Sequence, residues 1–388
     1  MKRVGFVMAH TPAGWTGGLN YYSNLLHAIL TVPGRKIEPV LIVPNEMPAS
    51  ILDDFPGIEV VRTAMVSPSK AWKIARQGTK YALGHDFWFE HLLRAHDISL
   101  LSHSGGLGRA SPVPTVGWLP DFQHVRLPEF FSERELVARD KMFRRITEDC
   151  SSLVLSSLDA QRDLSSFAPD AIGKSRVLHF VCGMAKVREA STLAELKTRF
   201  DLNEPYFHLP NQFWAHKNHR LVINALAELK SRGQPVLVVA TGHTADPRRP
   251  KAFEELMRHA ATLGVADRFR VLGLVSKPEL LGLMDNAVAI VNPSLFEGWS
   301  TTVEESKSLG KKILLSDIPV HREQAPERAV YFSPDDPKQL ADALLTTSAQ
   351  YEPAAEPVHR QAAAQQLPKR LVEFGLDYQR IALQALAD

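Results

Sequence analysis

The chain has 388 residues, of which 45% are hydrophobic and 23% charged, a composition typical of globular proteins. Lysine and arginine number 45 and aspartate and glutamate 43, so the net charge of +2 excludes the strongly basic footprint of a nucleic-acid-binding protein. Two distant cysteines, Cys150 and Cys182, form no metal-ligand spacing and fit a reduced cytoplasmic protein. The apolar run at the N-terminus is too short for a signal peptide, and no stretch approaches the ~20 apolar residues of a membrane-spanning helix.

The length indicates two α/β domains. The first begins with a buried strand, Val4 to Met8, a loop containing Gly17 and Gly18, and a helix from about Leu19 to Leu30. This order is the opening of a doubly wound domain, and the two glycines allow the backbone to approach a ligand closely. Further strands of this domain, with helices between several of them, are predicted at 39–43, 58–62, 98–101, 113–118, 153–156 and 177–180.

Two of the predicted helices, Ser69 to Tyr81 and Glu133 to Thr147, carry several lysines or arginines beside apolar side chains. Such helices can lie on an anionic membrane face. A solvated basic face on a helix packed against the core is commoner, and we favour that interpretation. Peripheral contact with the inner face of the cytoplasmic membrane is the alternative.

The segment GWLPDFQH follows a predicted strand and places Asp121 and His124 on a loop at the edge of the sheet. A carboxylate and an imidazole at this place can both point into a cleft. Alternatively, Asp121 caps the turn and His124 packs beneath it. The sequence leaves both alternatives open.

Residues 184–203 are predicted to link the domains, with one amphipathic helix at 192–199. The second α/β domain is predicted to contain strands at 206–209, 236–241, 269–272, 288–291, 313–315 and 330–332. A last helix, 367–387, has no strand after it and is expected to pack back on the first domain. The expected division is therefore 1–183 with 367–388, the linker 184–203, and 204–366.

Two helix starts of the second domain carry charged side chains. In EGWSTTVEE, Glu297 on a loop and Glu305 on a helix stand eight residues apart around a helix start whose free N–H groups can receive a phosphate. Thr301 and Glu304 are predicted to form a capping box, which explains Glu304 without chemistry. In QFWAHKNH, Lys217 offers a positive charge just before a second helix. An anion site between two carboxylates suits a sugar nucleotide.

These segments resemble the retaining GT-B glycosyltransferases of glycosyltransferase family 4, closely over 206–332 and more loosely over 1–180. Glu297 to Glu305 looks like the family's signature of a glutamate, seven residues and a second glutamate. The segment HKNH, which contains Lys217, is similar to its phosphate-lysine segment, and Gly17 and Gly18 fall where its first-domain glycine loop approaches the diphosphate. The resemblance implies two Rossmann-like doubly wound domains facing each other across a cleft, with the C-terminal helix returning to the first.

The resemblance also implies roles for matching residues. Glu305 would accept hydrogen bonds from the ribose hydroxyls, Glu297 would hold hydroxyls of the donor sugar, and Lys217 would neutralise the departing diphosphate. Asp121 or His124 falls near the family's first-domain polar group beside the reacting sugar. The catalytic candidates are Lys217, Glu297, Asp121 and His124. The other donor-binding candidates are Gly17, Gly18, Gln212, Gly273, Val275, Gly298, Trp299, Ser300, Thr301 and Thr302.

Two departures from the family pattern affect these expectations. Gln212 stands where the family usually has an arginine, so stabilisation of the leaving group rests more on Lys217, on helix termini or on another arginine such as Arg248. Ser300 and Thr302 stand where the family commonly has glycine and proline, which changes the shape of the loop.

The sequence thus predicts a cytoplasmic, retaining, hexosyltransferase-type enzyme that moves a sugar from a nucleoside-diphosphate sugar to a hydroxyl of a glycan or glycolipid, as in bacterial-type surface polysaccharide synthesis. No cofactor and no metal are expected, because there is no Asp-x-Asp run and the histidines lack ligand spacing. A sugar-nucleotide 2-epimerase of the same fold and a non-catalytic partner subunit are the alternatives. A nicotinamide dehydrogenase is disfavoured because the glycine fingerprint is missing.

Overall fold

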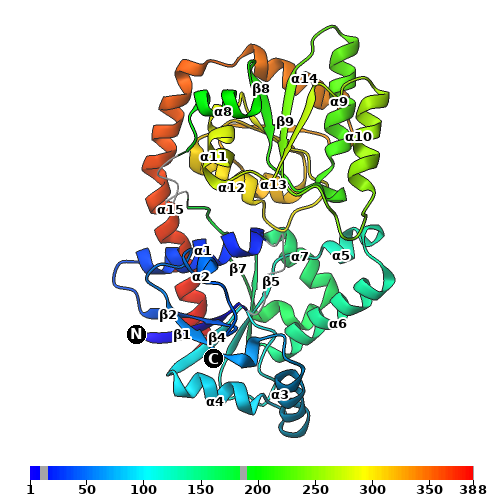
Figure 1. The fold of residues 1–388 in the computed structure, drawn as a ribbon. Coiled ribbons are helices and arrows are strands. Elements are labelled where there is room, and N and C mark those ends of the chain that lie inside the picture. The colour runs from blue at the N-terminus through cyan, green and yellow to red at the C-terminus, as the bar shows by residue number, and fades with distance from the viewer. Residues whose placement is uncertain (9–15, 184–189, 388) are drawn as a thin grey trace. The chain divides into compact units, whose positions relative to one another are not determined.

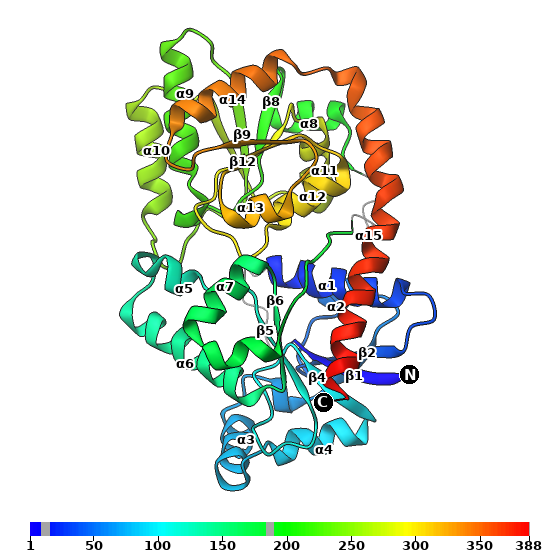
Figure 2. The ribbon, with the colours of Figure 1, turned by 180° about the vertical axis from the view of Figure 1, so that it is seen from behind.

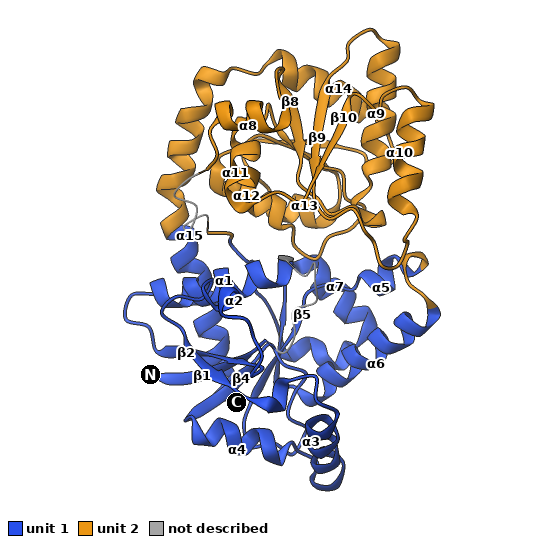
Figure 3. Cartoon of the chain, viewed as in Figure 1, with its two compact units in different colours: residues 1–128, 133–181, 369–388 blue, residues 129–132, 182–368 orange. Residues whose placement is uncertain are grey.

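The computed structural model describes residues 1–8, 16–183 and 190–387 (Figure 1). The chain forms two compact units (Figure 3). The first contains residues 1–128, 133–181 and 369–388, and the second contains residues 129–132 and 182–368. The sequence predicts the two main divisions at 183 and 366, and it does not predict that 129–132 belong with the second unit.

The first unit is built on a seven-stranded sheet of order β3-β2-β1-β4-β5-β6-β7, and every pair of neighbours in it is parallel. The strands are β1 (Lys2–Val7), β2 (Ile37–Val43), β3 (Glu59–Arg62), β4 (Ile98–Ser102), β5 (Thr115–Leu119), β6 (Ser152–Leu155) and β7 (Ser175–Val177). Short and largely buried runs form β2, β4, β5 and β6, as the sequence predicts, whereas the outer strands β3 and β7 are partly exposed. The strand order reverses between β1 and β4, which makes that edge the expected ligand position.

The helices of the first unit are α1 (Thr16–Thr31), α2 (Ala49–Leu52), α3 (Lys70–Leu83), α4 (Phe87–Ala95), α5 (Gln123–Arg126), α6 (Glu133–Asp149) and α7 (Leu158–Phe167). Short 3-10 helices span Ala64–Val66, Pro128–Phe130 and Pro169–Lys174. One prediction is wrong here, because α1 begins at Thr16 and therefore holds Gly17 and Gly18 in its first turn. The low helix propensity of glycine favours a later start, but N–H groups of a first turn need no helical partner. The loop residues 10–15 lie outside the described residues.

The second unit has a six-stranded parallel sheet of order β10-β9-β8-β11-β12-β13. Its strands are β8 (Tyr206–Leu209), β9 (Leu237–Thr241), β10 (Phe269–Gly273), β11 (Ile290–Asn292), β12 (Ile313–Ser316) and β13 (Ala329–Phe332). Its helices are α8 (Leu193–Phe200), α9 (His219–Ser231), α10 (Ala252–Thr262), α11 (Lys277–Asn286), α12 (Thr301–Leu309), α13 (Pro319–Gln324) and α14 (Pro337–Ala349), with a 3-10 turn at Ala215–Lys217. Apolar clusters cover both faces of the sheet, so both units are doubly wound Rossmann-like domains.

The predicted linker and C-terminal helix differ from the observed ones. Leu196 on α8 and Leu202 after it are each 1% exposed in the core of the second unit, so residues 190–203 belong to that unit. Residues 184–189 of the predicted linker lie outside the described residues. The last helix, α15 (Glu356–Ala385), follows a 3-10 turn at Pro353–Ala355 and is continuous through Pro368 (Figure 2). Its last part belongs to the first unit, as the sequence predicts, and Tyr378 there donates a hydrogen bond to Ser102 Oγ at 2.7 Å.

Candidate functional site

The second unit brings two of the predicted site residues into direct contact at the point where its strand order reverses. The loop after β8 carries Lys217, and the loop after β11 carries Glu297. These strands are neighbours in the sheet but belong to opposite winding directions. Their carboxyl ends form the crevice in which doubly wound domains bind ligands.

Buried polar side chains hold the two loops together. Asn211 Nδ2 donates to Asn292 Oδ1 at 3.2 Å, and the Thr302 hydroxyl donates to Asn211 Oδ1 at 3.2 Å. The backbone N–H of Leu295 donates to the carbonyl of His216 at 2.8 Å. A buried amide left without its partner would be costly, so these bonds fix the distance between the loops. Sequence reasoning assigned no role to Asn211 or Asn292, although each lies within two residues of the end of a predicted strand.

An ion pair connects the predicted phosphate lysine with the predicted sugar-binding glutamate. Lys217 Nζ donates to Glu297 Oε1 at 2.6 Å, and the Ser294 hydroxyl donates to the same oxygen at 2.6 Å. The side chains of Lys217 and Glu297 are only 15% and 9% exposed. Burial raises the pKa of Glu297, but the charge of Lys217, with contributions from His216 and His321, outweighs burial and lowers that pKa to about 2. Glu297 therefore stays ionised near neutral pH.

The start of α12 is capped differently from the prediction. Ser300, not Thr301, is the N-cap, and its hydroxyl oxygen accepts the Val303 N–H at 3.4 Å. Asn292 Nδ2 also donates to this oxygen at 2.8 Å, which selects Ser300 over its neighbour. Glu304 makes no capping box, because its buried carboxylate accepts from Lys307 at 3.2 Å and from Gln324 at 3.1 Å.

This cap leaves part of the helix start open to an anion. The Ser300 N–H is occupied, since it donates to Gln324 Oε1 at 3.1 Å. The N–H groups of Thr301 and Thr302 have no acceptor among the residues that the structure describes. Free N–H groups in the first turn of a helix are the usual receptors of phosphate. Of the predicted amide contacts, Thr301 and Thr302 are thus available and Ser300 is not.

Glu305 follows these amides on α12, with Gly298 and Trp299 on the loop before the cap. The side chain of Glu305 is half-buried, and burial of its carboxyl raises the pKa to about 7. A carboxyl poised near neutrality at the carboxyl edge of a sheet is a candidate ligand-binding group.

The predicted base segment and the replacement arginine lie at the same edge of the second sheet. The N–H of Gly242, after β9, donates to the carbonyl of Gly273 at 2.9 Å, and Val275 follows on the next loop. A Cβ on Gly242 would lie 2.4 Å from the carbonyl oxygen of Asn211, so only glycine lets these loops meet. The guanidinium of Arg248 lies 5.4 Å from the ring centre of Trp214, close to Lys217 in sequence, and its Nε contacts Asp246 at 3.4 Å. Gln212 accepts the N–H of Trp214 through its backbone carbonyl at 2.8 Å.

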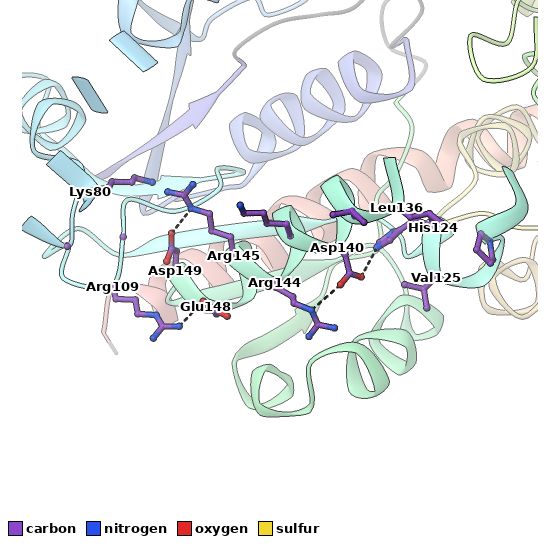
Figure 4. A pocket seen from close by; sticks show the side chains of 15 residues that line it. Lys80, Arg109, His124, Val125, Leu136, Asp140, Arg144, Arg145, Glu148 and Asp149 are labelled. Carbon is purple, nitrogen blue, oxygen red and sulfur yellow. Dashed lines mark hydrogen bonds and ion pairs between the residues drawn. The ribbon is translucent and has the colours of Figure 1, made fainter. Parts of the chain in front are cut away.

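In the first unit, the structure matches the packing alternative for Asp121 and His124. Asp121 Oδ1 accepts the N–H of Gln123 at 2.9 Å, in the turn that leads into α5. His124 lies on α5, not on a loop as predicted, and its ring packs edge-on against Phe143 at 4.7 Å. Burial lowers the pKa of His124, and the side chain lines a pocket of about 1040 Å³ along α6 (Figure 4). A catalytic role for either residue stays a prediction.

Sequence reasoning missed His103, which ends β4 where the first sheet reverses its strand order. Its φ of 55° is uncommon for a residue other than glycine, and its buried ring contacts the hydroxyls of Tyr21 and Ser102 at 2.8 Å each. Burial lowers its pKa to about 3, so the imidazole is neutral at pH 7. The segment SHSGG directly after a predicted strand is the signal that could have identified it.

Within the described ranges, no helix combines the length and apolarity needed to cross a bilayer. The same ranges contain no group of three or more histidine, cysteine, aspartate or glutamate side chains placed to hold a metal ion.

Comparison with known proteins finds a family match in the second unit. Residues 194–362, less than half of the chain, match the family described as glycosyl transferases group 1. The O-antigen chain mannosyltransferase RfbU of Salmonella typhimurium is 30% identical over 142 residues, which are 36% of this chain and 38% of that protein. The aligned segment thus spans well under half the length of this relative.

Solved glycosyltransferase structures share the fold of the whole chain. The structural match with HepE from Anabaena, solved in complex with UDP and glucose, covers 100% of both chains, with a TM-score of 0.70 and 16% sequence identity. A glycosyltransferase from Rickettsia africae covers 100% of this chain and 99% of its own with a TM-score of 0.67 at 14% identity. The chain therefore has the GT-B type of fold, built from two Rossmann-like domains.

Proposed function

We propose that the protein transfers a sugar from a nucleoside-diphosphate sugar to a hydroxyl of a glycan or glycolipid, with retention of the anomeric configuration. The observation that carries this proposal is the ion pair between Lys217 and Glu297, which stands at the reversal point of the second sheet beside the free N–H groups of Thr301 and Thr302. A cation and two N–H groups suit a diphosphate, and carboxylates suit sugar hydroxyls. The shared fold with HepE, solved with UDP and glucose, supports the same donor class.

In this proposal the positively charged groups stabilise the negative charge that develops on the leaving diphosphate. The bond from the anomeric carbon to the phosphate oxygen breaks, and a bond from that carbon to the acceptor oxygen forms on the same face. The acceptor proton passes to a phosphate oxygen of the departing nucleoside diphosphate. Lys217 and the amides of Thr301 and Thr302 stabilise the developing negative charge, so neither a protein nucleophile nor a metal is needed. Arg248 adds the positive charge that Gln212 does not supply.

The two acidic side chains would fix the donor. Glu297 presents an ionised carboxylate to the sugar hydroxyls, and its pairing with Lys217 couples sugar recognition to the diphosphate. Glu305 accepts hydrogen bonds from the ribose hydroxyls in its ionised form, which bound hydroxyl donors would favour. Surface polysaccharide or lipopolysaccharide assembly in the cytoplasm is the matching context, since part of the chain is similar to the O-antigen chain mannosyltransferase RfbU.

Incubation with candidate nucleotide sugars tests this function. The protein is mixed with each donor, with and without a bacterial glycolipid extract, and free nucleoside diphosphate and the anomeric configuration of the product are measured. If the protein is a retaining transferase, adding the acceptor should increase the release of nucleoside diphosphate. The anomeric configuration of the product should also be the same as that of the donor. Conversion of one nucleotide sugar into another without release would instead identify a 2-epimerase, and no turnover with any donor would favour a non-catalytic subunit.

A further inference from the structure

A pocket of about 680 Å³ in the first unit has no role in the proposed donor site. It lies at the reversal point of the first sheet, bordered by Val7 at the end of β1, by residues 103–106 after β4, and by helices α3 and α6. Ligands of doubly wound domains bind at this position. The charges of the pocket indicate which ligand it would take.

Cations outnumber carboxylates among the side chains that line this pocket. The charged lining residues are Lys73, Arg76, Lys80 and Arg145 against Asp86. Arg76 is already neutralised, because its Nε donates to Asp86 Oδ2 at 2.7 Å and its Nη1 donates to the carbonyl of Met65 at 2.9 Å. Of the other three cations, Arg145 pairs with Asp149 at 3.3 Å, and no carboxylate of the described residues pairs with Lys73 or Lys80.

Two of these cations are held close to each other. Lys80 and Arg145 point their charged ends toward one another (Figure 4). Lys80 Nζ donates to the carbonyl of Gly106 at 2.5 Å, and Arg145 Nε contacts Asp149 at 3.3 Å. Burial and the charge of Arg145 lower the pKa of Lys80, although Asp86 and Asp149 act in the opposite direction. A bound anion would relieve this repulsion.

The third cation and the loop after β4 supply further donors. Lys73 is exposed, and no carboxylate of the described residues pairs with its Nζ. Gly106 has a φ of 83°, and a Cβ there would lie 2.7 Å from Asp149 Cβ, so only glycine lets this loop border the pocket. Ser69 adds a hydroxyl to the lining, whereas the hydroxyl of Ser67 already donates to Glu46 Oε2 at 2.7 Å. Lysine, arginine and hydroxyl donors around a cavity are the usual environment of a phosphate.

The neighbouring pocket of about 1040 Å³ is less suited to an anion. Lys80 and Arg145 line both pockets, but most cations of the larger one are paired with carboxylates: Arg109 with Glu148 at 2.8 Å and Arg144 with Asp140 at 3.1 Å (Figure 4). The larger pocket is lined by the carboxylates of Asp140, Glu148 and Asp149, whereas the smaller one is lined by Asp86 alone, so an anion meets less repulsion in the smaller pocket.

We propose that the smaller pocket binds a phosphate group of the acceptor, so that the acceptor is a phosphate-bearing glycan or glycolipid. That the phosphate belongs to the sugar acceptor rests on the proposed function. That the pocket binds a phosphate does not. The phosphate oxygens accept hydrogen bonds from Lys73, Lys80 and Arg145, and the rest of the acceptor leaves through the mouth of the pocket.

Calorimetric titration of the full chain with inorganic pyrophosphate tests the site. Lys80→Gln and Arg145→Gln should each weaken binding by about tenfold, because each removes one charge-assisted hydrogen bond, and Lys80→Arg should restore most of the affinity. Arg134→Gln is the matched control, since Arg134 is an exposed cation of α6 outside both pockets. Pyrophosphate bound beside Lys217 would appear as a separate component that none of these substitutions changes. Arg145 is 48% exposed, so Arg145→Gln keeps the test decisive if Lys80→Gln does not fold.

A second arm identifies the source of the phosphate. The protein is mixed with phosphatidylcholine vesicles that do or do not contain phosphatidylglycerol, and pyrophosphate is added as competitor. Anionic vesicles that bind and are displaced by pyrophosphate indicate a lipid headgroup, whereas pyrophosphate binding without vesicle binding indicates a phosphate on the soluble part of the acceptor. Equal pyrophosphate affinity in the parent protein, Lys80→Gln and Arg145→Gln, or an equal loss in Arg134→Gln, would overturn the proposal. Pyrophosphate binding without transfer from any donor would refute the proposed function and leave the phosphate site standing.

Discussion

Replacing Lys217 by methionine should destabilise the second unit, because it leaves the buried carboxylate of Glu297 without its cation. Two independent estimates give the size of the loss. The drop of the Glu297 pKa from its ordinary 4.5 to about 2 corresponds to about 3 kcal/mol at ~1.4 kcal/mol per unit. Breaking one partner out of a buried ion pair typically costs about 3–5 kcal/mol. We therefore expect Lys217→Met to lower the free energy of unfolding by about 3 kcal/mol at pH 7.

Urea denaturation of the full chain measures this loss. The transition of the second unit is analysed for the parent protein, Lys217→Met, Glu297→Gln and the double variant. The double variant should lose clearly less free energy of unfolding than the two single variants added together, because it removes both charges at once. A carboxyl with a lowered folded pKa stabilises the protein above its unfolded pKa, and this stabilisation is lost as the pH falls from 4.5 toward 2. The gap between the parent and Lys217→Met should therefore narrow below pH 4.5. A gap under about 1 kcal/mol at pH 7, as for an exposed pair, would refute the reasoning.

Three further predictions follow from the geometry. Binding of a nucleoside-diphosphate sugar, whose diphosphate has no group that titrates near neutrality, should release a proton from Glu305 at pH 6.5, since the pKa of Glu305 is about 7; calorimetry in two buffers of different ionisation enthalpy should show proton release in the parent and none in Glu305→Gln. Gly375→Ala should destabilise the first unit by more than about 1 kcal/mol in urea, because its Cβ would lie 2.3 Å from the carbonyl oxygen of Ala28, whereas Gly78→Ala on an open face of α3 should stabilise by about 0.5–1 kcal/mol; equal effects would contradict the packing of α15. Arg248→Gln should lower kcat about tenfold with little change in donor KM, and an unchanged kcat would exclude Arg248 as the replacement for the missing arginine.

The sheets and the Lys217–Glu297 pair were accessible from the sequence, because they depend on local patterns. Buried parallel strands are short apolar runs, and β8 was predicted with its observed bounds, Tyr206–Leu209. Both charged residues lie on the loops that follow such runs, and the carboxyl ends of neighbouring parallel strands meet. The family resemblance then assigned them to one site, which the ion pair at 2.6 Å agrees with.

Tertiary contacts decided what the sequence could not. Ser300 and Thr301 are both good N-caps, and the bond from Asn292, eight residues earlier in the chain, selects Ser300. The two alternatives for Asp121 and His124 could be separated only by seeing which groups surround them. His103 was missed although the segment SHSGG directly follows a predicted strand, because its left-handed φ just after β4 and its buried contacts are set by the tertiary structure.

The last helix begins earlier than predicted for a similar reason. The sequence places its start at 367, after the proline- and alanine-containing stretch 352–366. The structure continues α15 from Glu356, where Glu356 accepts from Lys311 and Arg328 at 2.8 Å each. These long-range ion pairs hold the early turns of the helix in place, and the local sequence pattern does not predict them.

The central claim is that the second unit grips an activated sugar at the reversal point of its sheet. Hydrogen exchange measured by mass spectrometry, with and without the nucleotide sugar that binds, tests it most directly. The account predicts slower exchange in the segments 211–219 and 294–305, and loss of that protection in Lys217→Met. Protection confined to other segments, or the same protection in Lys217→Met, would contradict it.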